Sequence, residues 1–133
     1  MYGKLYNWYA VNDPRGLAPT GWHIPSDAEW TTLPAFLGGN TIAGGAMKAT
    51  TGWNAPNTGA TNSSGFTGLP GGYRDENGEF SVIGYDGYWW TSTEDLSDPP
   101  SIAFSHLLLY DRTNANEFGL YKTYGISVRC VRD

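Results

Sequence analysis

Three segments in the C-terminal half of the chain have the pattern of strands that share one sheet. Residues 84–94 (GYDGYWWTSTE) contain a tryptophan pair followed by hydroxyl-bearing side chains. Residues 124–133 (YGISVRCVRD) alternate apolar and polar side chains with a period of two, which is typical of a strand with one buried face. Between them lies an apolar run at residues 101–110. We therefore predict an antiparallel sheet that the N-terminal half of the chain covers.

The composition of the remaining chain favours loops over long helices. There are 18 glycines and 8 prolines among 133 residues, and both residue types weaken helix interiors. Six tryptophans provide large apolar anchors that hold such loops to a core. The length is sufficient for one domain with a substantial buried core. We predict a single α+β domain over residues 1–133.

The charge of the chain argues against two classes of partner. The net charge is −5 and no basic run is present, whereas nucleic-acid binding needs clustered lysine and arginine side chains. No stretch approaches the roughly 20 consecutive apolar residues of a membrane-spanning helix. We therefore expect neither nucleic-acid binding nor membrane insertion. The sequence leaves the oligomeric state open.

A capping box marks the start of the best-defined helix. In SDAE, Ser26 can accept from the backbone N–H of Glu29, and the Glu29 side chain can reach back to Ser26. The predicted helix runs from Ser26 to about Leu37 and ends at two glycines, with a bend or an early end at Pro34. Its buried stripe is predicted to consist of Trp30, Leu33 and Leu37.

The other elements follow from local patterns. We predict an opening strand at residues 2–11, which pairs with the C-terminal run and helps to bury Ile126, Val128 and Cys130. A hairpin turn is predicted at residues 75–78 (DENG). The remaining predictions are a second helix at 41–51, a long packed loop at 53–72, strands at 88–93, 102–110 and 119–131, and connecting loops at 95–100 and 111–117.

Several motifs occur in an order that resembles a known family. They are YGKLYNWYAV, LAPTGWHIPSDAEWTTL, LGG, AGGAMK, TNSSGFTGLPGGYRDENGEF, GYWWTSTE and YGISVRCVRD. Together they are similar to the Fibrobacter succinogenes major paralogous domain family over essentially the whole chain. The resemblance implies a C-type lectin-like fold, with two short helices, a twisted antiparallel sheet, long packed loops and paired N- and C-terminal strands. It also implies an extracellular or cell-surface location in bacteria.

The resemblance carries two further implications. Members of the family usually have another segment ahead of YGKLYNWYAV, so this chain is expected to lack the usual N-terminal portion. Relatives with the same fold include hypervariable binding proteins of diversity-generating retroelements, in which the C-terminal strands and loops present the variable residues. A surface or phage-encoded binding protein of that kind is an alternative interpretation of the chain.

A lectin-like site requires exposed aromatic rings together with side chains that hydrogen-bond to hydroxyl groups. The candidates near the C-terminal strands are Tyr73, Arg74, Tyr88, Trp90, His106, Tyr110, Asp111, Arg112, Asn114, Asn116 and Lys122. Alternation places Phe104, His106, Leu108 and Tyr110 on one face, which we predict to be exposed. Consecutive strand residues point to opposite faces, so one of Trp89 and Trp90 belongs in the core. We predict that Trp90 is the exposed one.

Metal binding and catalysis are weaker interpretations. Loops at residues 95–98, 75–79 and 111–116 offer oxygen ligands for a structural calcium ion, but none has regular EF-hand spacing. We assign no metal ligand and no cofactor, with structural calcium kept as an alternative. The formylglycine-generating enzymes have a similar fold, but their chemistry needs two cysteines and this chain has only Cys130. Paired carboxylates among Glu79, Asp86 and Glu94 are the remaining catalytic option.

These observations favour a module that binds a ligand without catalysis. The predicted function is binding or adhesion to a glycan or protein ligand, through the exposed face and loops of the C-terminal strands. A diversified binding protein and an enzyme of altered chemistry are the alternatives.

Overall fold

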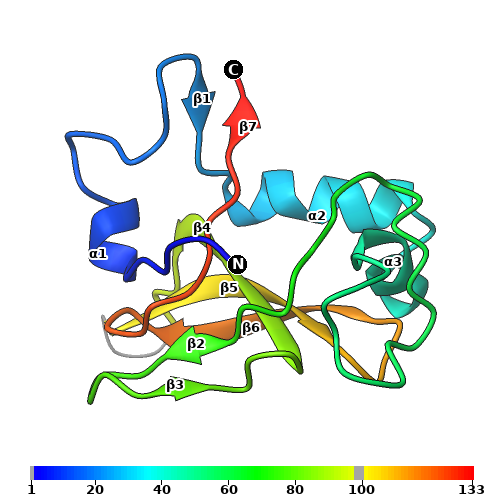
Figure 1. The fold of residues 1–133 in the computed structure, drawn as a ribbon. Coiled ribbons are helices and arrows are strands. Elements are labelled where there is room, and N and C mark those ends of the chain that lie inside the picture. Colours follow the sequence, from blue (N-terminus) through cyan, green and yellow to red (C-terminus); the bar gives the residue numbers. More distant parts are fainter. Residues whose placement is uncertain (1, 98–100) are drawn as a thin grey trace.

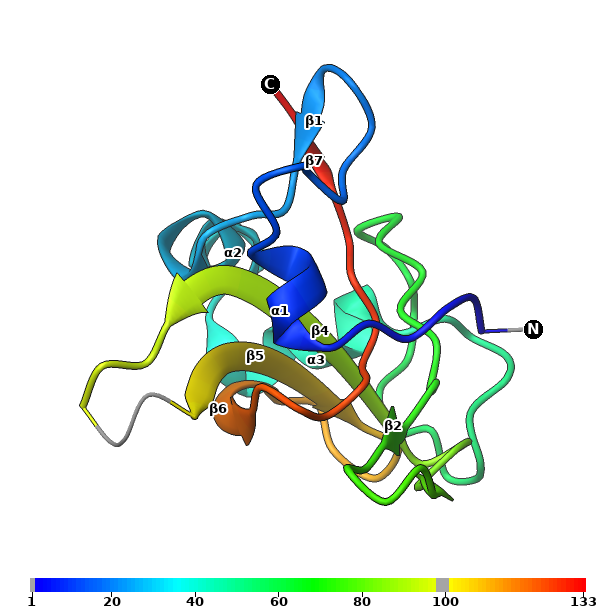
Figure 2. The same ribbon diagram turned by 90° about the vertical axis from the view of Figure 1, so that its left-hand side faces the viewer.

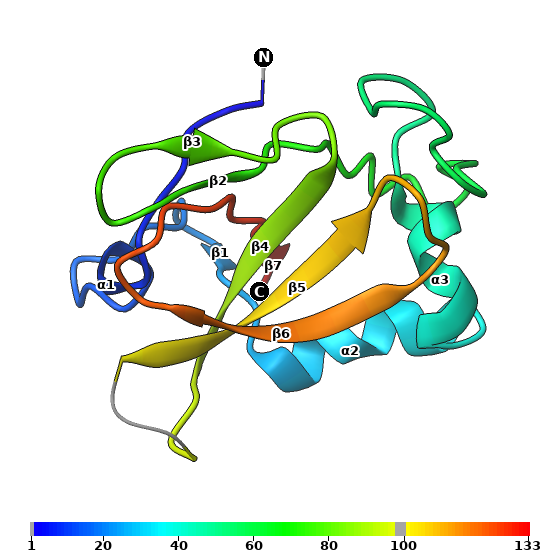
Figure 3. The same cartoon turned by 90° about the horizontal axis from the view of Figure 1, so that it is seen from below.

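A three-stranded antiparallel sheet lies at the centre of the molecule. The computed structural model describes residues 2–97 and 101–133 (Figure 1). The sheet consists of β4 (Asp86–Glu94), β5 (Ile102–Leu109) and β6 (Ala115–Tyr121), in the order β4-β5-β6. Figure 3 shows the three strands side by side from below. The predicted α+β class and antiparallel sheet are confirmed, and the connection between β4 and β5 contains residues 98–100, which lie outside the described residues.

Both faces of the sheet are covered. Helices α2 (Asp27–Phe36) and α3 (Asn40–Met47) pack on one face, over a core that contains Trp89 and Leu108. Helix α1 (Trp8–Val11) and the C-terminal segment pack on the other face, over a second core that contains Trp90. Figure 2 shows α1 in front of the strands. The prediction of an exposed β5 face is therefore wrong: His106 and Leu108 are buried, and Phe104 and Tyr110 are half-buried.

Helix α2 forms as its capping box predicts. Ser26 accepts a hydrogen bond from the backbone N–H of Glu29 at 3.2 Å, and the Glu29 carboxylate accepts one from the backbone N–H of Ser26 at 2.9 Å. Pro34 is tolerated inside the helix and is buried. The helix ends at Phe36, one residue before the predicted end. Trp30 is buried, and the other two members of the predicted stripe, Leu33 and Leu37, are half-buried against the same core.

Helix α3 is shorter than predicted because the chain leaves it at Lys48 to bond elsewhere. The backbone of Lys48 is extended. The residues on either side of Lys48 bond to Gly68: the backbone N–H of Ala49 donates to the Gly68 carbonyl, and the Met47 carbonyl accepts from the Gly68 N–H. Two glycines inside the helix permit close packing: a Cβ at Gly44 would lie 2.2 Å from the carbonyl oxygen of Asn114, and one at Gly45 would lie 2.4 Å from that of Gly59. The AGGAM motif is therefore a contact surface for the β5–β6 turn and the loop that follows the helix.

The predicted opening strand at residues 2–11 is wrong. Only Tyr6 forms a bridge, to Ile126, and the chain then enters α1. The reason is local: the Asn7 side chain accepts from the backbone N–H of Ala10 and caps the helix, which overrides the strand preference of the aromatic residues.

The C-terminal run is not one continuous strand. The predicted strand at 119–131 is divided into the end of β6, three isolated bridges at residues 125–127, and β7 (Val131–Arg132). Strand β7 pairs with β1 (Trp22–His23), so the N- and C-terminal parts lie side by side, but mainly through β1. Ile126 is buried as predicted, while Val128 and Cys130 are half-buried.

The predicted hairpin turn is confirmed. Strands β2 (Tyr73–Arg74) and β3 (Phe80–Ser81) are joined by a turn in which the Asp75 carboxylate accepts from the backbone N–H groups of Asn77 and Glu79. Residues 53–72 form a loop packed around Trp53, Phe66 and Leu69, as expected. Among the described residues, no helix has the length and apolar character needed to cross a bilayer.

Candidate ligand-binding surfaces

Trp89 and Trp90, one of which was predicted to be exposed, are both buried. Trp90 has 0 % of its surface exposed, and its indole N–H donates to the carbonyl oxygen of Tyr6 at 2.8 Å. Trp89 is 5 % exposed and packs on the opposite face, against Trp30 and Phe66. The prediction that Trp89 and Trp90 point to opposite faces of the sheet is therefore confirmed. The prediction that Trp90 is exposed is wrong, because the N-terminal segment and α1 cover its face.

Three further predicted site residues are buried and have structural partners. Tyr88 donates from its hydroxyl to Asp86 at 3.1 Å, and burial raises the pKa of that hydroxyl well above its usual range. Lys122 forms an ion pair with Glu94, and its ammonium lies 4.8 Å from the centre of a Trp8 ring. His106 is the third.

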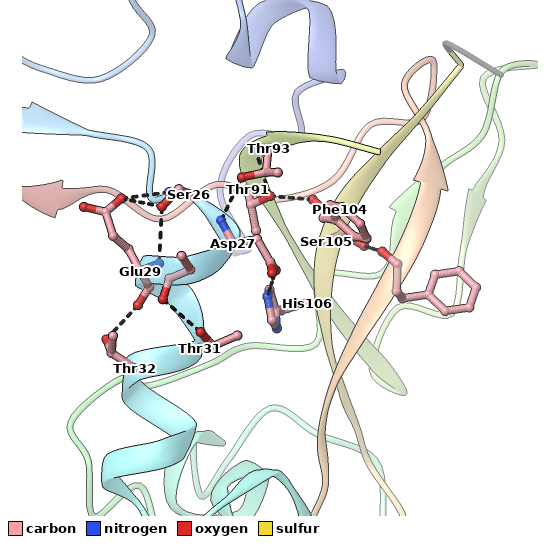
Figure 4. Close-up of polar contacts among 12 residues, drawn as sticks. Ser26, Asp27, Glu29, Thr31, Thr32, Thr91, Thr93, Phe104, Ser105 and His106 are labelled. Atoms are coloured by element: carbon pink, nitrogen blue, oxygen red, sulfur yellow. Dashed lines mark hydrogen bonds and ion pairs between the residues drawn. The ribbon is translucent and has the colours of Figure 1, made fainter. Parts of the chain in front are cut away.

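His106 links the sheet to the start of α2. Its Nε2 lies 2.8 Å from Oδ1 of Asp27 (Figure 4). The His106 ring also stacks on Trp30 at a centroid distance of 4.9 Å. Asp27 in turn donates from its backbone N–H to the hydroxyl of Thr93 at 3.0 Å. Burial lowers the pKa of His106 despite the nearby carboxylate. The contacts fix the helix on the sheet, and the ring is closed to solvent.

The predicted residues that follow β5 lie around a turn that a buried lysine organises. Asp111 and Arg112 are exposed there, and Asn114 and Asn116 are half-buried. Beneath them, the Lys48 ammonium donates to the carbonyl oxygens of Thr58, Leu109 and Arg112 at 2.8, 2.9 and 2.8 Å. Tyr110 packs edge-on against Tyr85 at 5.0 Å. A side-chain cation therefore binds the carbonyl groups of this turn.

Two carboxylates of the acidic loops accept hydrogen bonds from groups of their own loop. Asp75 caps the hairpin turn, and Asp95 accepts from the backbone N–H and the hydroxyl of Ser97. Asp98, part of one loop considered for calcium, lies outside the described residues. Within residues 2–97 and 101–133, no group of three or more His, Cys, Asp or Glu side chains is placed to hold a metal ion.

Two of the carboxylates considered for catalysis, Asp86 and Glu94, lie far apart. Asp86 and Glu94 are the first and last residues of the nine-residue strand β4. At about 3.3 Å per residue, they lie roughly 26 Å apart. Glu79 lies at the end of the hairpin turn, next to β3.

One group of aromatic side chains does reach the surface together. Tyr73, Tyr124 and Tyr121 follow one another, with centroid distances of 5.4 Å and 6.0 Å. Tyr121 is 55 % exposed, Tyr73 and Tyr124 are half-buried, and Arg74 beside them is exposed. Burial, Tyr73 and the carboxylates of Glu76 and Asp75 raise the pKa of the Tyr124 hydroxyl. We call Tyr73, Tyr121 and Tyr124 the tyrosine ledge.

The ledge forms because three separate segments meet at one end of the sheet. Tyr73 lies on β2, Tyr121 ends β6, and Tyr124 follows the turn after β6. Backbone hydrogen bonds between Arg74 and Gly125, 2.8 Å in each direction, hold β2 against that turn. The sequence analysis selected Tyr73 and Arg74 but missed Tyr121 and Tyr124, because the turn that brings them to β2 interrupts the predicted strand.

A cleft of about 380 Å³ lies on another part of the surface, beside α2. Its walls come from α2, from the loop at residues 64–66 and from the C-terminal residues 129–131; we call it the α2 cleft. The lining residues are Pro25, Glu29, Trp30, Thr32, Leu33, Ser64, Gly65, Phe66, Arg129, Cys130 and Val131. None of them belongs to the predicted site. Burial raises the pKa of the Cys130 thiol, which keeps it in its unreactive protonated form.

The chain is an α+β fold whose sheet is covered on both faces, with two candidate binding surfaces, the tyrosine ledge and the α2 cleft. The family described as the Fibrobacter succinogenes major domain matches residues 1–132. The chain therefore belongs to that family. No curated protein and no solved structure matched the chain.

Proposed function

We propose that the chain is a non-catalytic binding module that holds a glycan through the tyrosine ledge. The observation that carries the proposal is the run of three neighbouring tyrosine rings, of which Tyr121 is exposed and the other two are half-buried. Sugar rings present apolar C–H faces that pack on aromatic rings, while their hydroxyl groups need polar partners at the edge. Arg74 and the carboxylates of Asp75 and Glu76 supply such partners beside the ledge.

The ledge and the residue beside it include two of the residues expected from the sequence, Tyr73 and Arg74, and add Tyr121 and Tyr124. The ledge lies at the end of β6 and on the turn that follows, where a lectin-like domain has the loops of its C-terminal strands. Tyr73 and Tyr124 pack against the core that contains Trp90, so the fold supports this surface from within. In this proposal a sugar ring stacks on Tyr121 and not, as the sequence suggested, on Trp90.

The proposal includes a C-type lectin-like fold and a location at the bacterial cell surface. Two helices on one side of a twisted antiparallel sheet and the pairing of β1 with β7 support the fold assignment. Exposed aromatic residues on a chain of net charge −5 suit a domain that meets its ligand in solution.

Glycan-array binding with two matched variants tests the proposal. Tyr121→Ala removes the most exposed ring of the ledge, and Tyr9→Ala removes an equally exposed tyrosine, at 56 % against 55 %, on α1. We expect Tyr121→Ala to weaken binding to any glycan held by the wild type by about ten-fold or more, equivalent to about 1.4 kcal/mol. Tyr9→Ala should keep the wild-type binding.

Two results would contradict this proposal. If Tyr121→Ala and the wild type bind the same glycans equally well, the ledge is not the site. If the wild type binds no glycan on the array, the glycan class is wrong and a protein ligand becomes the better hypothesis. Urea unfolding of both variants checks that each remains folded.

A further inference from the structure

The α2 cleft has apolar walls suited to a flat ligand. Trp30 and Phe66 meet edge to face at 5.6 Å, and Leu33 and Pro25 extend the apolar surface beside them. The volume of about 380 Å³ lies within the range of small-molecule sites in proteins. Because the walls come from three segments distant in the sequence, the packed fold holds the shape of the cleft.

Arg129 brings a positive charge to this cleft without a matching carboxylate. Its guanidinium lies 4.5 Å from the centre of the Phe66 ring and donates to the carbonyl oxygen of Phe66. Within the described part of the chain, no Asp or Glu lies within ion-pair distance of it. Arg129 is exposed by surface area, so a ligand can reach it, and partial desolvation lowers the pKa of its guanidinium. A guanidinium has five N–H donors, so most of its donors remain for a ligand.

A second donor in the cleft wall also lacks an acceptor. Trp30 is 6 % exposed, and its indole N–H has no hydrogen-bond partner among the residues that the structure describes. Buried N–H groups are nearly always paired, so this group is a departure from the usual pattern. This N–H is closed to solvent, so the exposed guanidinium of Arg129 is the donor that a ligand oxygen reaches directly.

Glu29 is the one carboxylate among the lining residues, and its oxygens are already in use. It accepts from the backbone N–H and the hydroxyl of Ser26, both at 2.9 Å, and lies 3.0 Å from Nε2 of His23. It is therefore committed to the cap of α2. Its charge disfavours an anion beside it, and Glu29 does not lie within ion-pair distance of Arg129, which leaves the guanidinium as the place for a negative group.

From these contacts we infer that the α2 cleft binds a small aryl carboxylate, with the aromatic body against the apolar wall of Phe66 and Leu33 and the carboxylate on Arg129. The planar guanidinium matches a carboxylate in two-point geometry, which a compact ammonium does not. This site is separate from the tyrosine ledge and does not depend on glycan binding there.

A charge series of one aromatic body tests the chemical class. Phenylacetate, phenethyl alcohol and phenethylamine are titrated separately into the isotope-labelled chain, and amide and indole N–H resonances are followed by NMR. We expect phenylacetate to bind about ten-fold or more tightly than the alcohol, because it adds charge-assisted hydrogen bonds. The amine should bind more weakly than the alcohol. The shifted resonances should include the Trp30 indole.

Substitution of two nearby arginines tests the assigned residue. Arg129→Gln should reduce the affinity for phenylacetate to that for the alcohol, and Arg129→Lys should recover only part of it. Arg132→Gln is the matched control, since Arg132 is exposed on β7 and does not line the cleft. Tyr121→Ala should leave phenylacetate binding unchanged. Each variant is first shown to be folded by its wild-type dispersion of amide resonances.

Several outcomes would overturn the inference. Equal binding of phenylacetate by Arg129→Gln and wild type would remove Arg129 from the site. Preference for the amine would mean that Glu29 sets the charge selectivity. If phenylacetate shifts no resonance of the α2 cleft, the site does not bind this class. Loss of glycan binding in Tyr121→Ala, with phenylacetate binding retained, would distinguish the two sites.

Discussion

Replacement of Lys48 by methionine should destabilise the protein strongly, although no charged partner is lost. Lys48 has no exposed surface, and its ammonium joins the end of α3 to the loop at Thr58 and to the β5–β6 turn through three carbonyl oxygens. Methionine preserves the apolar stem and nearly the same length. The substitution therefore isolates the three hydrogen bonds and the charge.

Two opposing contributions set the magnitude. Hydrogen bonds to a charged group contribute about 1.5–3 kcal/mol each, so the loss of three costs roughly 4–9 kcal/mol. Removing the ammonium also relieves its desolvation, which lowers the pKa of Lys48 to about 8 and corresponds to about 3 kcal/mol. We expect a net loss of roughly 1–6 kcal/mol in the free energy of unfolding.

Urea unfolding followed by tryptophan fluorescence and far-ultraviolet circular dichroism measures this change. Lys4→Met is the control, because Lys4 is exposed and its substitution should change the free energy of unfolding by less than about 0.5 kcal/mol. An unchanged or increased stability of Lys48→Met would refute the reasoning, since desolvation of the ammonium would then cancel its hydrogen bonds completely.

Three further predictions concern the packing and the histidines. Trp90→Ala should cost about 3–5 kcal/mol in urea unfolding, because a fully buried indole is lost; a cost below 1 kcal/mol would mean that its face is open. Gly44→Ala should cost about 1–3 kcal/mol by the same measurement, since its Cβ would lie 2.2 Å from a backbone oxygen, and a neutral outcome would contradict that close contact. His23 and His106 should show opposite pH dependences of stability. Carboxylates of Asp133 and Glu29 raise the pKa of His23, so its contribution is complete below pH 6.5 and is lost as the pH rises through the folded-state pKa. Burial lowers the pKa of His106, so stability is lost as the pH falls from 6.5 toward the folded-state pKa, and this acid-side loss should be absent in His106→Gln.

Local signals in the sequence predicted the elements whose causes are local. The capping box of α2 and the turn at residues 75–78 each depend on side chains within four residues of one another, and both form as expected. The apolar runs of β4 and β5 were also predicted. In contrast, α1 depends on Asn7 as a cap within an aromatic segment that favours strands, so residue preference alone gave the wrong element.

The surfaces were harder to predict because their causes are distant in the sequence. Alternation shows that Trp89 and Trp90 face opposite ways, but it does not show whether one or both faces are covered. Whether the Trp90 face is covered depends on α1, and α1 forms because the Asn7 side chain caps it. The α2 cleft joins α2 to residues 64–66 and 129–131, and no local pattern indicates that these segments meet. Tyr73 was predicted as a binding residue near the C-terminal strands, but its contact with Tyr124 was not predicted.

The position of Trp89 and Trp90 has a consequence for how the molecule melts. Trp89 and Trp90 are consecutive residues of β4, and each packs in a different core. If one core unfolds, the strand on which the other core depends is disturbed. The two halves therefore form one thermodynamic unit, and their heat absorption should appear as one peak with equal calorimetric and van 't Hoff enthalpies. The tyrosine ledge and the α2 cleft, on opposite sides of this strand, share a common melting temperature.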